Sequence, residues 1–356
     1  MINASPRDAA AVTGQLGPAL VGPCRDPDIT VEFTDRIPLS SAVRYVGVDD
    51  AGFTDDAFLV LRGSHKSRVK VQIPFHEIGR ECRIVCESGL SAVPFLVAIL
   101  NLTALGKGFV PLHASAFTYR GTGVLVTGWA RGGKSETLVA FAAKGAEYVG
   151  DEWVYLSEDG QRMWGLPQAI KLWDWHLQDV PQYRNAIRPA DRIRLRGLGV
   201  VGGLLNGWDS FGERRRSSPP RLLRRVSALV NQQRYVHVPP ERLFRGGIGS
   251  LSGSPQRVFF VVSHDDPRVT VSPMAPEEIA RRMVFSLQEE RALFLSYYLK
   301  FRFAFPGFSN DLIERAEEIQ RDLLLRALSG KEAFAVHHPY PVSLEALFEA
   351  MNPCWA

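Results

Sequence analysis

The sequence predicts an α/β protein with a β-rich N-terminal part and helices near the C-terminus. The composition is that of an ordinary globular protein, with 46% hydrophobic and 22% charged residues among 356. In the first third, short β-branched and aromatic runs are separated by turn residues, which is typical of strands. From residue 106 onward, strand patterns alternate with helical ones, as in α/β folds.

Composition also limits the class of protein. A net charge of +4 and the high apolar content exclude disordered, collagen-like and coiled-coil chains. Four scattered cysteines do not form a disulfide framework and indicate a reducing compartment. No secretory signal precedes residue 26, and the most apolar stretch, 90–105, is short for a membrane span and contains Pro94 and Asn101. We therefore expect a cytoplasmic protein with no membrane segment.

The chain divides into four expected regions. Residues 1–26 are small and polar and are expected to be a flexible tail. A β-rich N-terminal domain is expected over 27–105, an α/β domain over 106–330 and a C-terminal segment over 331–356. In the N-terminal domain a helix is expected at about 90–105, after strands at Ile29–Phe33, Ala42–Val48, Ala57–Leu61, Val69–Ile73 and Cys82–Cys86.

The α/β domain has a regular pattern of expected elements. Strands are expected at 114–119, 124–127, 148–151, 153–156 and 258–262. Helices are expected at 134–144, 276–299 and 310–328.

A basic stretch interrupts this domain. Residues 184–234 contain twelve Arg and three acidic residues, a balance of +9 that leaves −5 for the rest of the chain. Its middle, about 205–235, is expected to be a loop. The stretch is either a solvated charged loop or a surface that attracts an acidic peptide or a triphosphate. Nucleic acid is disfavoured as a partner because the remaining chain is acidic and contains no nucleic-acid-binding module.

One motif is typical of phosphate binding. Residues 128–135 fit G-x-x-x-x-G-K-[ST] between an apolar strand and a helix-forming run that includes Glu136. Glycines allow successive N–H groups to point at phosphate oxygens, and the helix N-terminus adds positive charge. The lysine neutralises phosphate and the hydroxyl can ligate Mg²⁺. The motif residues are Gly128, Trp129, Ala130, Arg131, Gly132, Gly133, Lys134 and Ser135.

Acidic residues follow the next strand. Asp151 and Glu152 are adjacent at the end of the strand after the motif helix. Of such a pair, one carboxylate can hold or orient Mg²⁺ and the other can accept the proton of an attacking hydroxyl. His113 lies on the strand that neighbours the motif strand, which favours a catalytic role over simple packing.

Together these segments resemble the catalytic domain of HPr kinase/phosphorylase. The resemblance rests on Leu112-His113-Ala114-Ser115, on 123–128, on 133–137, on 144–146 and on Val149-Gly150-Asp151-Glu152. It covers about residues 105–160, with a fainter likeness at 195–199. It implies a P-loop kinase core of the HPr kinase/phosphoenolpyruvate carboxykinase type, with ATP and Mg²⁺ as cofactors.

The resemblance also implies roles for individual residues. Lys134 and the loop amides would bind the phosphates, with Ser135 and Glu152 on the metal. Asp151 would be the general base toward the acceptor hydroxyl. His113 would lie beside Asp151 and orient it, and Arg196 would face the transferred phosphate.

Two departures from the family narrow the function. The family's second aspartate is Glu152 here, and Arg194 replaces an acidic residue before the second likeness. The first change is compatible with kinase chemistry, whereas the second argues against the reverse phosphorolysis.

The N-terminal region does not resemble the family's own N-terminal domain. The chain is therefore more similar to HPr-kinase-related serine kinases of biosynthetic pathways, such as those that modify lasso precursor peptides. The expected partners are a nucleotide and a Ser/Thr hydroxyl of a peptide or protein, or a small-molecule hydroxyl. The related family forms hexamers, so a homo-oligomer is also an expectation. Two other hypotheses about function remain open: a non-catalytic nucleotide-binding regulator and a simple NTP hydrolase.

Overall fold

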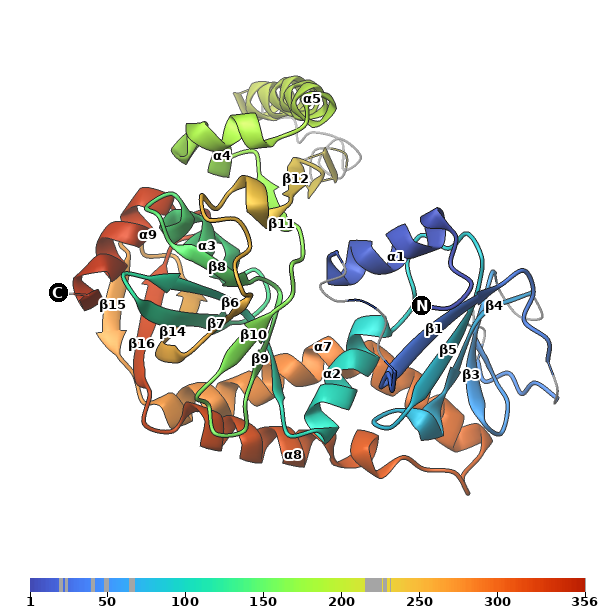
Figure 1. Cartoon of the computed structure of the whole chain (residues 1–356). Coiled ribbons are helices and arrows are strands. Elements are labelled where there is room, and N and C mark those ends of the chain that lie inside the picture. The colour runs from blue at the N-terminus through green and yellow to red at the C-terminus, as the bar shows by residue number, and fades with distance from the viewer. Residues whose placement is uncertain are drawn as a thin grey trace.

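The computed structural model shows a mixed α/β protein with two β-sheets joined by long helices (Figure 1). The α/β class predicted from the sequence is confirmed. For residues 204–214 the backbone alone is described. The described residues are 1–18, 22, 25–39, 42–47, 51–63, 68–214, 226, 229–230 and 232–355.

The N-terminal sheet has the strand order β1-β5-β4-β3-β2, in which β1 and β5 are parallel and the other pairs antiparallel. Alternate residues of β1 and β4 are buried, as expected for a sheet with one face on a core. Four of the five predicted strands are confirmed. The fifth, Ala42–Val48, was wrong over its described residues, where Arg44 makes an isolated bridge to Phe53. The bounds are β1 (Ile29–Thr34), β2 (Ala51–Phe53), β3 (Ala57–Leu61), β4 (Val69–Pro74) and β5 (Cys82–Glu87).

The N-terminus is structured rather than a flexible tail. Residues Pro6–Leu16 form helix α1, which begins with Ser5 as N-cap, proline at the first position and a capping box to Asp8. The buried Asp8 carboxylate also accepts a 2.6 Å hydrogen bond from the Gly89 N–H. These contacts fix the first 17 residues to the N-terminal sheet.

The central sheet has the order β13-β10-β9-β6-β7-β14-β16-β15, and β8 also pairs with β6. Helix α3 covers one face together with α9, and α2, α7 and α8 cover the other. Its first elements are α2 (Leu96–Gly106), β6 (Val110–Tyr119), β7 (Thr122–Gly128), α3 (Lys134–Ala142), β8 (Glu147–Gly150), β9 (Trp153–Leu156) and β10 (Met163–Gly165). The later ones are β13 (Ser252–Gly253), β14 (Pro255–Ser263), β15 (Thr270–Pro273), β16 (Glu332–His338) and α9 (Leu344–Met351).

Residues 331–356 are not a separate C-terminal segment. Strand β16 lies inside the central sheet, parallel to β14 over Glu332–His338. Helix α9 then packs on α3 through Leu347 and Phe348. The last strand of the chain therefore completes the sheet that carries the glycine-rich loop.

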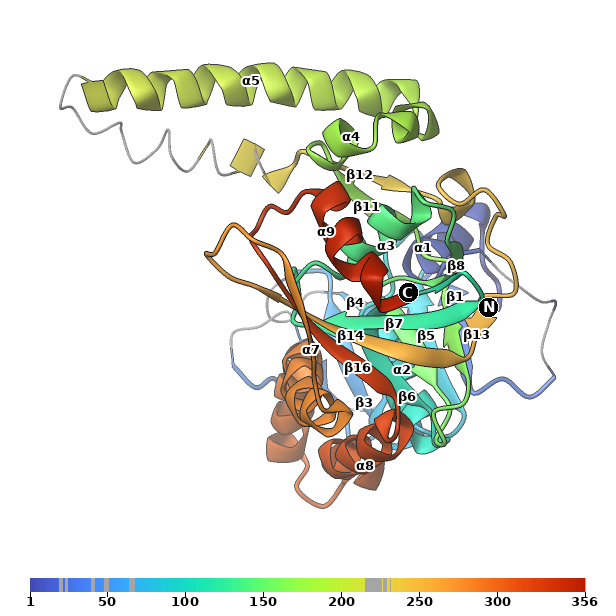
Figure 2. The same cartoon turned by 90° about the vertical axis from the view of Figure 1, so that its left-hand side faces the viewer.

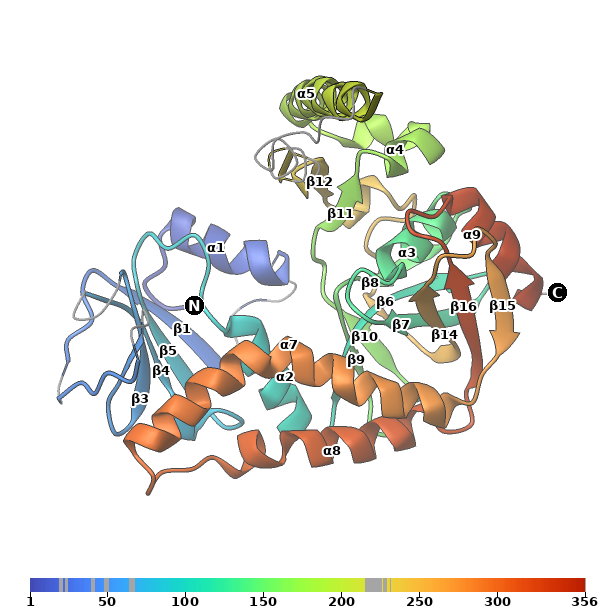
Figure 3. The ribbon, with the colours of Figure 1, turned by 180° about the vertical axis from the view of Figure 1, so that it is seen from behind.

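Two long helices run beneath both sheets. Helices α7 (Pro276–Ala304) and α8 (Asp311–Leu328) cross from the central sheet to the N-terminal sheet (Figure 3). A single buried apolar cluster contains side chains of both sheets and both helices, such as Phe33, Leu125 and Phe294. The two sheets therefore share one core.

A small subdomain stands above the central sheet. It contains the antiparallel pair β11 (Ile170–Trp173) and β12 (Tyr235–Val238), the short helix α4 (His176–Asp179) and the long helix α5 (Pro189–Arg214) (Figure 2). The basic loop predicted at about 205–235 is wrong in part, because residues 205–214 continue α5 and 235 begins β12. Most of the remaining predicted loop lies outside the described residues.

Among the described residues, none of the helices combines the length and apolarity needed to cross a bilayer.

Candidate functional site

The glycine-rich loop lies between β7 and α3 at the end of the central sheet. Gly133, the N-cap of α3, has φ +105°, which an L side chain rarely adopts. A Cβ at this position would overlap the ring of His338, and the His338 Nε2 lies 2.8 Å from the Gly132 carbonyl oxygen. The fully buried His338 on β16 thus holds the loop backbone where α3 starts.

Lys134 folds back over this loop. Its Nζ donates to the carbonyl oxygens of Trp129 at 2.9 Å and Gly128 at 3.3 Å, and its side chain is buried. Burial lowers the pKa of Lys134, although nearby carboxylates led by Glu152 oppose this. The amine is therefore desolvated beside carboxylates, and an anion bound next to it would favour its charged form.

A break between β8 and β9 positions the acidic pair. Both strands pair with the same side of β6, and Asp151 and Glu152 lie between them. Glu152 takes a left-handed conformation with φ +66°, and its carbonyl accepts from the Ala114 N–H at 3.2 Å. Such local irregularities redirect side chains beside functional sites. Here the break turns Asp151 inward and leaves Glu152 exposed.

The Asp151 carboxylate joins three elements. It accepts hydrogen bonds from the Ser115 hydroxyl on β6 at 2.5 Å and from the Ser135 hydroxyl on α3 at 3.0 Å, and the residue is 2% exposed. Burial and then the charge of Glu152 raise the pKa of Asp151 to about 6, against the lowering effect of the two hydroxyls. Asp151 is thus a carboxylate more basic than an ordinary aspartate, and it lies beside the first turn of α3.

His113 contacts Glu152 rather than Asp151. Its Nε2 lies 3.2 Å from Glu152 Oε2, and its Nδ1 lies 2.6 Å from Glu290 Oε1 on α7. Burial opposes protonation of His113, but the bonds to Glu152 and Glu290 outweigh it and raise the His113 pKa. His113 thus contacts Glu152, and Ser115 contacts Asp151. That His113 tunes or orients Asp151 stays a prediction.

A pocket of about 220 Å³ lies over the loop and is called here the loop pocket. Beside the residues above, it contains a second lysine, Lys171 of β11. The Lys171 Nζ lies 4.3 Å from the Trp173 ring centre and 4.0 Å from that of Tyr235. Burial and then the charge of Arg131 lower the pKa of Lys171. The lining residues are His113, Ala130, Arg131, Gly132, Gly133, Lys134, Ser135, Glu136, Glu152, Lys171, Trp173 and Tyr340.

The donors of the loop pocket fit a hard cation together with an anion. Within the described part of the chain, no group of three or more His, Cys, Asp and Glu side chains is arranged to hold a metal ion. Mg²⁺, however, usually takes one or two carboxylates plus a hydroxyl and phosphate oxygens. The Ser135 hydroxyl and the Asp151 carboxylate provide such oxygens, and Glu152 is close enough to influence the charge of Asp151.

Arg196 is not brought to this site. It is an exposed residue of α5 and lines a separate cavity of about 470 Å³ with Asp174, Arg184 and Arg192. The reason is that the segment around Arg196 is helical and stands above the sheet rather than folding onto the loop. The role implied for Arg196 toward the transferred phosphate is therefore wrong.

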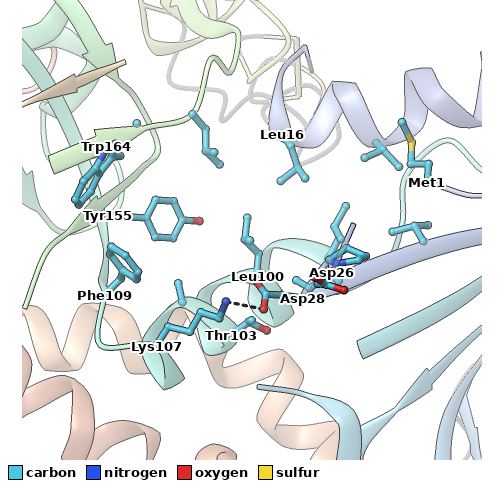
Figure 4. A pocket seen from close by; sticks show the side chains of 18 residues that line it. Met1, Leu16, Asp26, Asp28, Leu100, Thr103, Lys107, Phe109, Tyr155 and Trp164 are labelled. Atoms are coloured by element: carbon cyan, nitrogen blue, oxygen red, sulfur yellow. Dashed lines mark ion pairs between the residues drawn. The ribbon is translucent and has the colours of Figure 1, made fainter. Parts of the chain in front are cut away.

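A larger cavity lies elsewhere, between the two sheets (Figure 4). It has a volume of about 750 Å³ and apolar walls from α1, α2 and β9–β10, including Leu16, Leu100 and Trp164. Lys107 and Asp28 form an ion pair at 2.6 Å on its floor. Neither the glycine-rich loop nor the acidic pair lines it, so its size alone does not make it the phosphate site.

Several residues at the site were missed by sequence reasoning. Ser115 could have been found, because it is two residues from His113 on one strand and so shares its face. Glu290 and His338 lie on elements far away in sequence, α7 and β16. Strand β16 was not predicted, and the sequence offers no signal that places either residue at the site. The fully buried His176, whose Nε2 lies 3.4 Å from Glu136 Oε1, belongs to the same group.

A scan against protein-family models gives no match for this chain, and a search of curated proteins gives none either. The resemblance to HPr kinase/phosphorylase thus depends on the motif residues themselves.

Proposed function

We propose that this chain is a Mg²⁺-dependent ATP phosphotransferase that moves the γ-phosphoryl group to a Ser/Thr hydroxyl of a peptide or protein. The fold would be the P-loop kinase core of the HPr kinase type. The observation that carries the proposal is the buried Asp151 carboxylate, hydrogen-bonded to the Ser135 hydroxyl at the start of α3 and adjacent to the Lys134 cation.

The loop supports binding of a triphosphate. The first N–H groups of α3, including those of Lys134 and Ser135, have no partner inside the helix and carry its positive dipole end. Lys134 would exchange its bonds to the loop carbonyls for phosphate oxygens. Lys171 and Arg131 line the same pocket and add positive charge for the outer phosphates.

The acidic pair supports the transfer step. The acceptor O–H would give its proton to Asp151 while its oxygen forms a bond to the γ-phosphorus, and the bond to the β-phosphate oxygen would break to release ADP. Ser135, with Asp151 or Glu152, would hold Mg²⁺, which would supply positive charge to the phosphates. With a pKa of about 6, Asp151 is ionised at neutral pH and can accept this proton.

His113 would act through Glu152. Glu290 and Glu152 flank its ring, so the imidazolium would hold Glu152 in its exposed position at the edge of the pocket. His113 is therefore a positioning residue in this proposal.

One other acceptor and one non-catalytic function remain as alternatives. A small-molecule hydroxyl would use the same base and the same loop. A nucleotide-binding regulator would use the loop and transfer nothing, and its support in the sequence is the two departures from the family, Glu152 and Arg194.

The test uses γ-labelled ATP, Mg²⁺, a library of Ser- and Thr-containing peptides and a set of small hydroxyl compounds, read by mass spectrometry. We expect label on a peptide hydroxyl, and we expect Asp151→Asn to lower transfer at least 10²-fold while ATP affinity changes little. The matched control is Glu147→Gln, which removes an exposed carboxylate from β8, the strand that directly precedes Asp151.

Each outcome has a distinct meaning. Label in free phosphate alone indicates a hydrolase, and label on a small hydroxyl compound indicates the small-molecule alternative. Binding of ATP with no turnover indicates a regulator. Full transfer by Asp151→Asn would contradict the role of this residue as the base.

A further inference from the structure

A second pocket adjoins the loop pocket and is called here the aromatic pocket. Its volume is about 740 Å³, within the range of small-molecule sites. The two pockets share Arg131, Lys171, Trp173 and Tyr340, so a ligand on the loop can continue into the aromatic pocket. Its lining residues are Arg131, Lys171, Trp173, Asp174, Trp175, Gln178, Gln232, Gln233, Arg234, Tyr235, Tyr340 and Pro341.

Two of its rings are tied to the loop and to α3. Tyr340 follows His338, whose ring contacts the Gly132 carbonyl. Trp175 precedes His176, whose ring contacts Glu136 on α3. The Trp175 and Tyr340 ring centres are 6.1 Å apart at 88°, and Tyr340 is 45% exposed. These rings therefore flank the start of α3.

The acidic pair is absent from this pocket. None of Lys134, Asp151 and Glu152 lines it, although Lys134 and Glu152 line the loop pocket. The buried Asp151 lines neither pocket, but its hydrogen-bond partner Ser135 and its neighbour Glu152 line the loop pocket, so the group that receives phosphate would approach from there. The aromatic pocket is better placed for the other end of the donor nucleotide.

The chemistry of the lining fits a nucleobase. Aromatic faces stack on the flat face of any base. The amides of Gln178, Gln232 and Gln233 offer both donors and acceptors to base edges. Among the charged lining residues Arg131, Lys171 and Arg234 outnumber Asp174, which is paired with Arg234. An anionic ligand with an aromatic end satisfies all of these groups.

We infer that the aromatic pocket binds the nucleobase of the donor nucleotide, stacked on the face of Tyr340 with the perpendicular Trp175 ring at its edge. This inference rests on the proposed function, because it assumes a triphosphate on the loop. It makes the chain selective for a nucleoside triphosphate over a bare polyphosphate.

The experiment compares ATP with inorganic tripolyphosphate, each with Mg²⁺, by isothermal titration calorimetry. We expect the full-length protein to bind ATP at least tenfold more tightly than tripolyphosphate. Tyr340→Leu should lower ATP affinity about tenfold and leave tripolyphosphate affinity unchanged, whereas Tyr340→Phe should retain ATP affinity. Trp175→Leu is a second variant with the same expectation, and tripolyphosphate binding certifies that either variant is folded.

Equal affinities of the wild type for ATP and tripolyphosphate would overturn this inference and leave the proposed function standing. So would a Tyr340→Leu variant that loses both ligands equally, when Trp175→Leu leaves the preference for ATP intact. Failure of the wild type to bind either ligand would overturn the proposed function itself.

Discussion

At Asp151, burial and a neighbouring charge act against two hydrogen bonds. Its carboxylate is almost fully removed from water and lies next to Glu152, and both conditions disfavour its charge. Two serine hydroxyls from different elements compensate in part. A residue that served stability alone would not keep a charge in such a place, which is why perturbed carboxylates mark functional sites.

The first prediction concerns this charge. Because the folded-state pKa of Asp151 is about 6, above the ordinary value of 3.8, the folded protein holds this proton more tightly than the unfolded chain. The stability from this group is fully present below pH 3.8 and is lost as pH rises through 6. Asp151→Asn removes that loss, so its free energy of unfolding should exceed that of the wild type by about 1–3 kcal/mol at pH 7.5.

Urea denaturation at pH 4.5 and pH 7.5 measures this difference. The gain of Asp151→Asn should shrink toward zero at pH 4.5, whereas Glu147→Gln should show no comparable dependence on pH. A variant that is less stable than the wild type at pH 7.5 would mean that the hydrogen bonds to Ser115 and Ser135 outweigh the buried charge.

At the scale of elements, the site depends on the close approach of β8 and β10. A Cβ on Gly165 of β10 would overlap the Val149 carbonyl oxygen and the Gly150 Cα of β8. Gly150 is the last residue of β8 and directly precedes Asp151. Because residue 165 has no side chain, β8 can lie close to β10, and Asp151 at its end lies within hydrogen-bond distance of Ser135.

We predict that Gly165→Ala separates these strands. It should lower the free energy of unfolding by about 1–3 kcal/mol through overpacking, and it should lower phosphoryl transfer because Asp151 moves. Gly197→Ala on α5, where a Cβ meets open space, is the matched control and should stabilise the protein by about 0.5–1 kcal/mol. Thermal melts and the labelled-ATP assay measure both effects. Unchanged transfer in Gly165→Ala would mean that the spacing of β8 and β10 does not control the position of Asp151.

Elements with strong local signals were predictable. The glycine-rich loop, α3, β9 and β14 follow from glycine positions and apolar periodicity, and their predicted bounds agree within a few residues. Helix α1 was missed because its small residues suggested a tail. Ser5, Pro6 and Asp8 nevertheless form a sequence pattern that is typical of a helix N-terminus. β16 was missed because its partner β14 is more than sixty residues away in sequence, and such pairing has no local signature.

Separation in sequence also explains which residues of the site could be predicted. Lys134, Ser135, Asp151 and Glu152 were found because their spacing follows the chain order of one strand–loop–helix–strand unit. Glu290, His338 and Tyr340 reach the site from the last third of the chain, so tertiary packing alone brings them there. Arg196 was assigned to the site only through the fainter likeness at 195–199, and the structure puts that stretch in the long helix α5 above the sheet.

At the scale of the whole molecule, the two sheets form one folding unit. The buried ring of Phe75, which directly follows β4 of the N-terminal sheet, lies 4.8 Å from Phe301 and 5.9 Å from Phe294, both on α7. Asn310, which caps α8, donates its side-chain amide to the carbonyls of Phe75 and Ile78 at 2.7 and 2.9 Å. Glu290, which contacts His113, lies on the same helix α7. One helix, α7, thus packs against the N-terminal sheet and also contacts His113 at the site.

The last prediction tests this continuity. All seven tryptophans of the chain lie at or after residue 129, so tryptophan fluorescence reports unfolding of the central part and not of the N-terminal sheet. Phe75→Ala should lower the free energy of unfolding by about 3–5 kcal/mol. If one core joins the sheets, the urea midpoint measured by tryptophan fluorescence must fall with it and coincide with that measured by circular dichroism. Arg83→Ala, which breaks an exposed ion pair to Glu32 on the same sheet, should move neither midpoint by more than the equivalent of about 1 kcal/mol. A tryptophan midpoint that Phe75→Ala leaves unchanged would instead mean that the N-terminal sheet unfolds independently, and α7 would then transmit nothing from that sheet to His113.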